Sequence, residues 1–342
     1  DLPCGNDCES GVCDGDVCEP PTCEDSVANG NEGDIDCGGD CPERCQNGRS
    51  CNSNDDCALG NCVDGVCHNP PVFSLEGVSH ATDSEEFVDV PGSDLSFTPE
   101  SASEIWLILM SATITTSADG HASVAARYLI NDDASGRAVG RSDGGEDLPM
   151  SWQRMDWITE TTETQTIRVQ VLNESGNGRI DDLRIIALRL PADADVHVYR
   201  GDDASLPVPF GDSEDDVSPI DSLSVTPSER GEYLVMASFA INEDPSSSNV
   251  YARIRDPGDR TWKELTNNRP FWQPCFYARA QQLEAGEQQY RLEGRSSSRD
   301  GGTIQEIRMI ACRTESLADF WMEPTLEETS SASLTAESVT SL

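Results

Sequence analysis

The sequence predicts an all-β protein with a disulfide-rich N-terminal module followed by two tandem antiparallel β-sandwich domains. Three observations predict this fold class. Twelve of the 14 cysteines lie in the first 67 residues. Residues 72–190 and 205–315 repeat one another, with short apolar runs rich in β-branched and aromatic residues between Gly, Asp, Ser and Pro turns. No stretch keeps the 3.6-residue periodicity of a long amphipathic helix.

Composition limits the range of functions. The chain has 342 residues and a net charge of −40, so nucleic acids and anionic membranes would be repelled. Lys263 is the only lysine beside 22 arginines. An acidic, lysine-poor surface is typical of proteins from saline surroundings, where salt screens self-repulsion, or of proteins that bind divalent cations. We favour the first explanation as the general cause, with calcium sites as a local addition.

The cysteines indicate an extracellular or cell-surface location. An even number of cysteines, crowded into one acidic segment, is typical of structural disulfides formed in an oxidising compartment. Zinc is a weaker alternative, because His68 is the only nitrogen ligand in that segment. The chain begins at Asp1 without an apolar leader, so we expect a mature secreted protein. No apolar run approaches the ~18 residues of a membrane span.

Residues 1–70 form the cysteine-rich module, which contains an internal duplication. Residues 7–18 and 56–67 share the pattern D-C-x-x-G-x-C and both end in V-C. Apolar side chains are scarce here, so crosslinks must replace a core, each contributing ~2–4 kcal/mol. The expected bridges are Cys4–Cys13, Cys8–Cys18, Cys51–Cys62 and Cys57–Cys67, with Cys23, Cys37, Cys41 and Cys45 paired among themselves.

Between the two copies lies the segment N-G-N-E-G-D-I-D-C-G-G-D-C, residues 29–41. This segment resembles the N-G-x-E-x-D-x-D-C-G-G-x-C repeat of secreted surface proteins from marine and predatory bacteria, such as myxobacteria. The resemblance covers residues 4–67. It implies a surface-exposed spacer or adhesion module and no enzymatic activity.

The same segment is the best candidate for a metal site. Hard cations such as Ca²⁺ take six to eight oxygen ligands, often from alternate residues of a loop in which Gly permits the turn. The order of acids does not fit the EF-hand pattern. A turn held by side-chain hydrogen bonds is therefore the alternative. The candidate Ca²⁺ ligands are Asp25, Asn29, Asn31, Asp34 and Asp36, with Glu32 among them.

The two sandwiches match most clearly at their ends. Residues 178–189, G-R-I-D-D-L-R-I-I-A-L-R, align with residues 302–313, G-T-I-Q-E-I-R-M-I-A-C-R. Residues 95–100 align with 223–228, each before an apolar strand. A repeat of this length indicates a domain duplication. Residues 191–204 are expected to form an acidic linker, and residues 316–342 a Ser/Thr-rich tail.

The final strand of each repeat, ending in A-L-R or A-C-R, and the earlier W-x-L or Y-x-V strand resemble those of jelly-roll domains of the C1q and tumour-necrosis-factor group. The resemblance implies a jelly-roll-like fold and nothing about activity. Cys275 and Cys312 lie on expected strands of the second repeat. We expect an intradomain bridge between them, with intermolecular pairing as the alternative.

Several expected strands are apolar on both faces. Residues 105–110 read I-W-L-I-L-M, and segments 185–188 and 233–237 are similar. Strand side chains alternate between faces, so a strand with one face in water should alternate apolar with polar residues. Both faces must therefore be covered, within the chain or by another subunit. The sequence does not decide between these two.

No catalytic apparatus emerges from the motifs. Residues 140–144 match G-x-S-x-G, but the following G-E-D-L-P does not suit the helix that this nucleophile turn requires. His68, His80, His121 and His197 show no metal-ligand spacing. Acidic residues are too abundant to indicate acid–base catalysis. Asn173 fits the short N-x-S glycosylation pattern.

These observations favour a structural subunit of an extracellular filament or surface assembly. Copies would polymerise through sandwich contacts, and the tail at 324–342 could add a strand to a neighbour. The alternative is an adhesin or carbohydrate-binding surface protein. A hydrolase is the weakest hypothesis. Aromatic residues that could serve as sugar platforms, although core packing is the better interpretation for most of them, are Trp152, Trp157, Trp262, Phe271 and Trp272.

Overall fold

The computed structural model divides the chain into two compact units, Asp1–Pro71 and Val72–Leu342. The residues it describes are 8, 10–14, 17–58, 61–68, 72–117, 122–142, 150–175, 177–190, 194–201, 205–211, 213, 216–243, 249–262, 264–267, 273–297 and 301–314. The predicted tail at 316–342 lies outside them. Within the described residues the fold is all-β, as predicted, apart from one short 3₁₀ helix, η1 (Asn54–Asp56).

The first unit has very little regular structure. Its strands form two short ribbons, β1 (Cys13–Asp14) with β2 (Val17–Cys18), and β3 (Cys62–Val63) with β4 (Val66–Cys67). The largest buried cluster consists of half-cystines. Crosslinks therefore hold this unit together where apolar side chains are missing.

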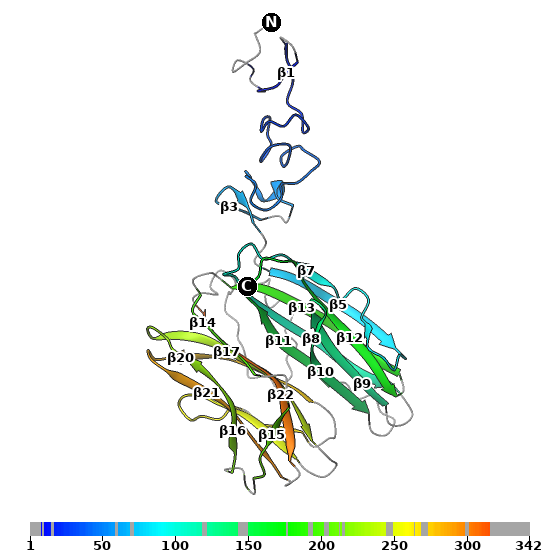
Figure 1. Cartoon of the computed structure of the whole chain (residues 1–342), viewed down its shortest axis with the longest axis vertical. Coiled ribbons are helices and arrows are strands. Elements are labelled where there is room, and N and C mark those ends of the chain that lie inside the picture. Colours follow the sequence, from blue (N-terminus) through cyan, green and yellow to red (C-terminus); the bar gives the residue numbers. More distant parts are fainter. Residues whose placement is uncertain are drawn as a thin grey trace. The chain divides into compact units, whose positions relative to one another are not determined.

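The first sandwich consists of two antiparallel sheets, one of four strands and one of five, that face each other (Figure 1). One sheet has the order β11-β8-β13-β5 and the other β10-β9-β12-β6, with β7 also pairing β12. This is the strand order of a jelly roll. Its strands are β5 (Val72–Thr82), β6 (Val88–Asp89), β7 (Leu95–Phe97), β8 (Ile105–Ser117), β9 (Ala122–Ile130), β10 (Asp133–Ser142), β11 (Met150–Ile158), β12 (Gln165–Ser175) and β13 (Asn177–Leu190).

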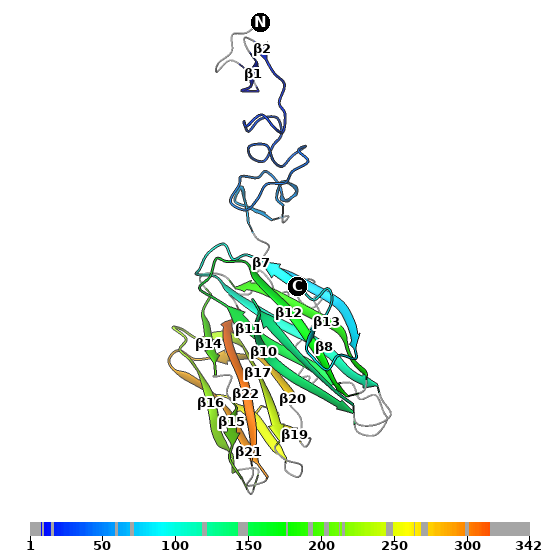
Figure 2. The same ribbon diagram turned by 45° about the vertical axis from the view of Figure 1, so that its right-hand side comes forward.

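The second sandwich repeats this order (Figure 2). Its sheets run β14-β22-β17-β20, with β15 also on β22, and β16-β21-β18-β19. Its strands are β14 (Val196–Arg200), β15 (Leu206–Val208), β16 (Ser218–Val225), β17 (Gly231–Glu243), β18 (Val250–Arg255), β19 (Leu265–Asn267), β20 (Gln273–Leu283), β21 (Gln288–Ser296) and β22 (Gly302–Arg313).

A shared irregularity supports a common origin of the repeats. Asp182 in β13 and Glu306 in β22 occupy equivalent positions, and both have positive φ, 51° and 56°. The pairing of each strand with its inner neighbour shifts register at this point. A β-bulge retained at one position in both copies indicates duplication of one ancestral sandwich.

The expected linker at 191–204 contains a strand instead. β14 pairs with β22, and Val196 lies opposite Cys312. The acidic composition of this segment predicted a linker, but it contains a short V-H-V-Y-R run whose alternating apolar residues suit an edge strand. The second sandwich therefore begins at β14.

The strands that are apolar on both faces cover each other within the chain. One face of each lines the core of its own sandwich, which contains Trp106 and Ile108 in the first repeat and Tyr233 and Val235 in the second. The other faces meet in a third buried cluster. Leu107 and Leu109 of β8 belong to it together with Leu234 and Met236 of β17, their equivalents. The two sandwiches thus form one body of four stacked sheets with three apolar layers.

Candidate functional site

A buried group of charged side chains lies at the contact between the two sandwiches. Arg154 and Asp156 come from β11, and Arg308 comes from β22; each is only 2% exposed. Arg308 Nε lies 3.5 Å from Asp156 Oδ2. Arg154 Nη2 lies 3.3 Å from a carboxylate oxygen of Glu306. Both of these ion pairs cross from one repeat to the other.

Asp156 is the centre of this group. Its carboxylate accepts hydrogen bonds from the Tyr128 hydroxyl, at 2.9 Å, and from the guanidinium of Arg200 on β14. Burial and the neighbouring Asp156 charge raise the pKa of Tyr128 well above its usual value, so the phenol stays protonated and donates. Arg200 also lies over the Trp157 ring, with its guanidinium carbon 4.9 Å from the ring centroid.

The arrangement suits docking of the repeats better than catalysis. Breaking one member of a buried ion pair leaves an uncompensated charge, which typically costs about 3–5 kcal/mol. A wrongly rotated second sandwich would leave Asp156 without its two guanidinium partners. The group therefore fixes how the apolar faces meet, a role that sequence analysis missed because its members are spread over four strands.

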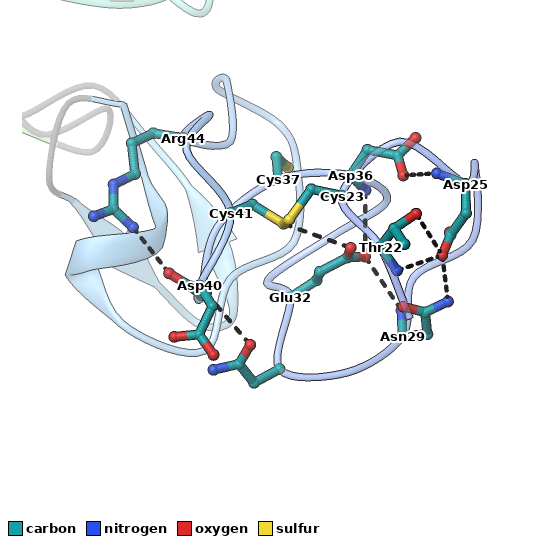
Figure 3. Close-up of a disulfide and its surroundings, with 12 residues drawn as sticks. Thr22, Cys23, Asp25, Asn29, Glu32, Asp36, Cys37, Asp40, Cys41 and Arg44 are labelled. Atoms are coloured by element: carbon teal, nitrogen blue, oxygen red, sulfur yellow. Dashed lines mark hydrogen bonds between the residues drawn. A yellow bond between two sulfur atoms is a disulfide. The ribbon is translucent and has the colours of Figure 1, made fainter. Parts of the chain in front are cut away.

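Three of the predicted calcium ligands, Asp25, Asn29 and Asp36, lie in hydrogen-bonded turns near the Cys23–Cys41 disulfide (Figure 3). Asp25 accepts the backbone N–H of Thr22 and Val27 and the side-chain amide of Asn29. Asp36 accepts the N–H of Asp25 and Ser26. These bonds bring Asp25, Asn29 and Asp36 together and agree with the hydrogen-bonded alternative.

The remaining predicted ligands lie in other contacts. Asp34 accepts the N–H of Ser50 at 2.8 Å and pairs with Arg49 at 3.7 Å, whereas Asn31 accepts the N–H of Asp40. Glu32 accepts the N–H of Asn29 and Asp36. Within the described part of the chain, the two groups whose His, Cys, Asp and Glu ligand atoms converge are Cys51–Cys57–Cys67 and Cys23–Glu32–Cys41. Their sulfurs are all in disulfides and offer no thiolate. Calcium binding by the predicted set stays a prediction.

Asp56 is a structural carboxylate that sequence analysis did not single out. It is 4% exposed and accepts three backbone hydrogen bonds, from Gly39 at 2.7 Å, Asn52 at 2.7 Å and Ser53 at 2.9 Å. These bonds, that from Gly39 foremost, lower the pKa of Asp56. Hydrogen bonds likewise lower the pKa of Asp25, where Asn29 contributes most, and of Asp34, where the Ser50 N–H contributes most.

The disulfides follow the predicted pairing in the described residues. Three expected bridges are present, and the four central cysteines pair among themselves. Cys13 forms no disulfide with a described residue, and its expected partner Cys4 lies outside them. The bridges are Cys8–Cys18, Cys23–Cys41, Cys37–Cys45, Cys51–Cys62 and Cys57–Cys67.

The expected Cys275–Cys312 bridge is wrong. Both residues are buried thiols. Strand β17 lies between β20 and β22, which carry the two cysteines, so two strand spacings of about 4.8 Å separate them. Cys275 also faces the core of the second sandwich, whereas Cys312 faces the contact with the first. A disulfide needs Cα atoms within about 7 Å and converging side chains.

The predicted sugar platforms that the structure describes are buried. Trp152, Trp157 and Trp262 are 0%, 7% and 5% exposed, whereas Phe271 and Trp272 lie outside the described residues. Asn173 is 4% exposed within β12, so its amide is inaccessible to a glycan. Ser142 of the G-x-S-x-G match ends strand β10, and residues 143–149 are not described. The described part of the chain contains no helix long and apolar enough to cross a membrane.

Together, the fold and the contact between the two sandwiches define a class of protein: a disulfide-rich module joined to two jelly rolls that dock through a buried apolar and charged layer. No protein-family model matches the chain, and no curated protein matches it.

Solved structures with some likeness to the chain include the N-terminal CBM22-1-CBM22-2 tandem domain of Xyn10C from Paenibacillus barcinonensis. That match has 12% identity and a TM-score of 0.20, and it covers 70% of this chain and 91% of the other. A structure of the infectious bursal disease virus Gx strain matches at 8% identity and a TM-score of 0.26, covering 70% and 73%. A β-glucuronidase from Bacteroides uniformis matches at 13% identity and a TM-score of 0.19, covering 62% of this chain but only 21% of the enzyme. Likenesses this weak transfer no activity or ligand to this chain.

Proposed function

We propose that the protein is a non-enzymatic structural subunit of an extracellular surface assembly, in which copies associate by strand addition at the free edge of β5. The observation that carries this proposal is the contrast between the covered sheet faces and the edge strand β5 in the body of four sheets. The apolar sheet faces cover each other inside the chain, but β5 is the last strand of its sheet. An edge strand presents unpaired backbone N–H and C=O groups that can pair with another chain.

The two repeats differ at this edge in a way that favours β5. In the first repeat the edge is one strand of 11 residues without proline. In the second repeat the equivalent edge is divided between β14, of five residues, and β15, of three residues, which contains Pro207. Short strands and proline are common means of blocking edge pairing. The second repeat is thus protected where the first is open.

The sequence supplies a candidate donor strand. Residues 333–342 read S-L-T-A-E-S-V-T-S-L, a run of small, hydroxyl-bearing and apolar residues that contains one Glu and no proline. Such a segment could lie along β5 of a second copy with its backbone groups paired. A head-to-tail contact of this kind does not close on itself and therefore generates a filament.

The test is the size of the purified protein in solution and in micrographs. We expect light scattering to show species larger than a monomer, increasing with concentration, and electron microscopy to show extended assemblies. Lysines placed on exposed β5 positions, S74K together with A81K, should reduce these species to monomers. The control S224K places the same charge on β16, an edge strand of another sheet. A wild-type monomer at all concentrations would refute the proposal.

The second candidate is a carbohydrate-binding adhesin. The observation that favours it is a group of four arginines on the outer sheet face of the second sandwich, of which Arg255 and Arg291 are partly exposed whereas Arg253 and Arg295 are buried. A glycan array separates the candidates, because only the adhesin is expected to bind glycans. Repeating the array with a calcium chelator tests whether the acidic turns at residues 25–36 contribute to that binding.

A further inference from the structure

The outer face of the β16-β21-β18-β19 sheet carries an unusual set of cross-strand pairs. Between β18 and β21, Tyr251 lies opposite Arg295, Arg253 opposite Glu293, and Arg255 opposite Arg291. The alternate residues, including Ala252, Ile254 and Leu292, line the core of the sandwich. These six outward-facing residues, which we call the arginine face, therefore hold four guanidinium groups in a chain with a net charge of −40.

The first repeat provides an internal comparison. The equivalent pairs between β9 and β12 are Ala125–Leu172, Arg127–Gln170 and Leu129–Arg168. Ala125 and Leu172 form a small apolar cluster with Phe87, and the guanidinium carbon of Arg127 lies 4.0 Å from the Phe87 ring centroid. The first repeat thus closes this face with apolar contacts. The second repeat has the Tyr251 ring and the additional guanidiniums of Arg255 and Arg295 in place of these contacts.

The two most exposed guanidiniums lie side by side on this face. The side chains of Arg255 and Arg291 are 23% and 35% exposed, and they face each other directly across the two strands. Like charges in this position repel one another. Glu293 offsets part of this charge, because its Oε2 accepts Nε–H bonds of 3.0 Å from both Arg253 and Arg255.

Donor capacity remains after these internal contacts. A guanidinium has five N–H donors. Arg255 uses one on Glu293 and one on the carbonyl of Asp259, and Arg291 pairs with the Asp259 carboxylate. The guanidinium of Arg295 lies 3.6 Å from the Tyr251 ring centroid, and its side chain is only 8% exposed, so Arg295 holds the ring in place while Arg255 and Arg291 offer the accessible donors.

We propose that the arginine face binds an anionic polysaccharide, one whose sugars carry carboxylate or sulfate groups. Guanidinium groups bind such oxyanions through paired hydrogen bonds. The Glu264 carboxylate, 26% exposed and 3.5 Å from Arg295 Nη2, can accept a sugar hydroxyl. The acidic remainder of the chain disfavours duplex nucleic acid, which carries one negative charge per about 1.7 Å of its axis. The inference concerns this face alone and holds whether or not copies self-associate through β5.

The experiment measures binding of the full chain to polygalacturonate, dextran sulfate, neutral dextran and duplex DNA by titration calorimetry at low salt. We expect one or both acidic polysaccharides to bind, neutral dextran not to bind, and affinity to fall as salt is added. The double variant R255Q/R291Q should lose about tenfold in affinity, equivalent to about 1.4 kcal/mol. Binding of polygalacturonate would indicate recognition of carboxylate groups, and binding of dextran sulfate would indicate recognition of sulfate groups.

Two control variants keep the test specific. R168Q removes the arginine of the first repeat that is equivalent to Arg291, and R230Q removes an arginine that is 67% exposed outside the face. Both should retain wild-type affinity. Equal affinity of R255Q/R291Q and wild type, an equal loss in R168Q, tighter binding of DNA, or no binding of either acidic polymer would each overturn the inference. If R255Q/R291Q unfolds at lower temperature than wild type, R291Q alone replaces it.

Discussion

At the scale of single residues, carboxylates and thiols are used as structural groups. Asp56 ties together two backbone segments of the first unit, one through the N–H group of Gly39 and the other through those of Asn52 and Ser53. Gly39 itself has φ of 56°, and a Cβ there would lie 2.0 Å from the carbonyl oxygen of Asn31. Gly38 has φ of 74°, and a Cβ there would lie 2.8 Å from the Asp56 Cβ, so close packing requires both glycines of the C-G-G sequence.

Acid should loosen this network. The folded-state pKa of Asp56 is lowered below its ordinary value of 3.8, so its contribution to stability is complete above that pH and is lost as the pH falls through the lowered folded pKa. In a pH titration followed by NMR, the amide signals of Gly39, Asn52 and Ser53 should shift together below pH 3.8. The D56N variant should abolish this common transition. Three unrelated midpoints in the wild type would contradict the assignment.

The thiols give a second prediction at this scale. Burial raises the pKa of Cys275 and of Cys312 to about 12, so neither forms a reactive thiolate at neutral pH. Native protein should leave both unmodified by iodoacetamide, and unreduced protein unfolded in guanidinium should be alkylated at both. Peptide mapping by mass spectrometry identifies the sites. A crosslinked peptide joining Cys275 to Cys312 would contradict the structure.

At the scale of elements, the sequence predicts the strands and the duplication well but not which faces meet. Alternation indicates that Leu107 and Leu109 share a face, yet their partners Leu234 and Met236 come from a strand more than 120 residues later. The wrong Cys275–Cys312 bridge has the same origin. Each cysteine was placed on a strand, but sequence does not reveal that β17 separates them.

The calcium candidates illustrate another limit. A run of acidic residues looks alike in sequence whether its oxygens bind a cation or backbone N–H groups. Here the backbone donors of Thr22, Asp25, Ser26 and Ser50 take up oxygens of the predicted ligands. The buried charged group around Asp156 was not predictable, because β9, β11, β14 and β22 contribute to it and no local pattern joins them.

The contact between the sandwiches can be tested with a matched pair of arginines. Arg308 and Arg184 are equivalent in the two repeats, but Arg308 meets buried Asp156 whereas Arg184 pairs with Asp182, whose side chain is 52% exposed. Urea unfolding should show that R308M costs about 3–5 kcal/mol, because it removes a partner of a buried charge. R184M should cost about 1 kcal/mol or less. Equal costs would mean that the buried pair does not stabilise the contact.

At the scale of the whole molecule, the two units have different means of stabilisation. Residues 1–70 contain 16 Asp and Glu against two Arg and depend on disulfides. Residues 72–314 depend on three apolar layers and on the buried charged group around Asp156 at the contact between the sandwiches. This division leaves the sheet edges and the outer faces as the surfaces that can contact other molecules.

The central claim is that the sandwiches cover each other's apolar faces, so that self-association uses the edge of β5. Hydrogen–deuterium exchange measured over a range of protein concentrations tests this most directly. We predict that protection of β8 and β17 stays constant, whereas protection of β5 rises with concentration. Protection of β8 and β17 that rises with concentration while β5 stays unchanged would show that the apolar faces meet between molecules and would contradict the account.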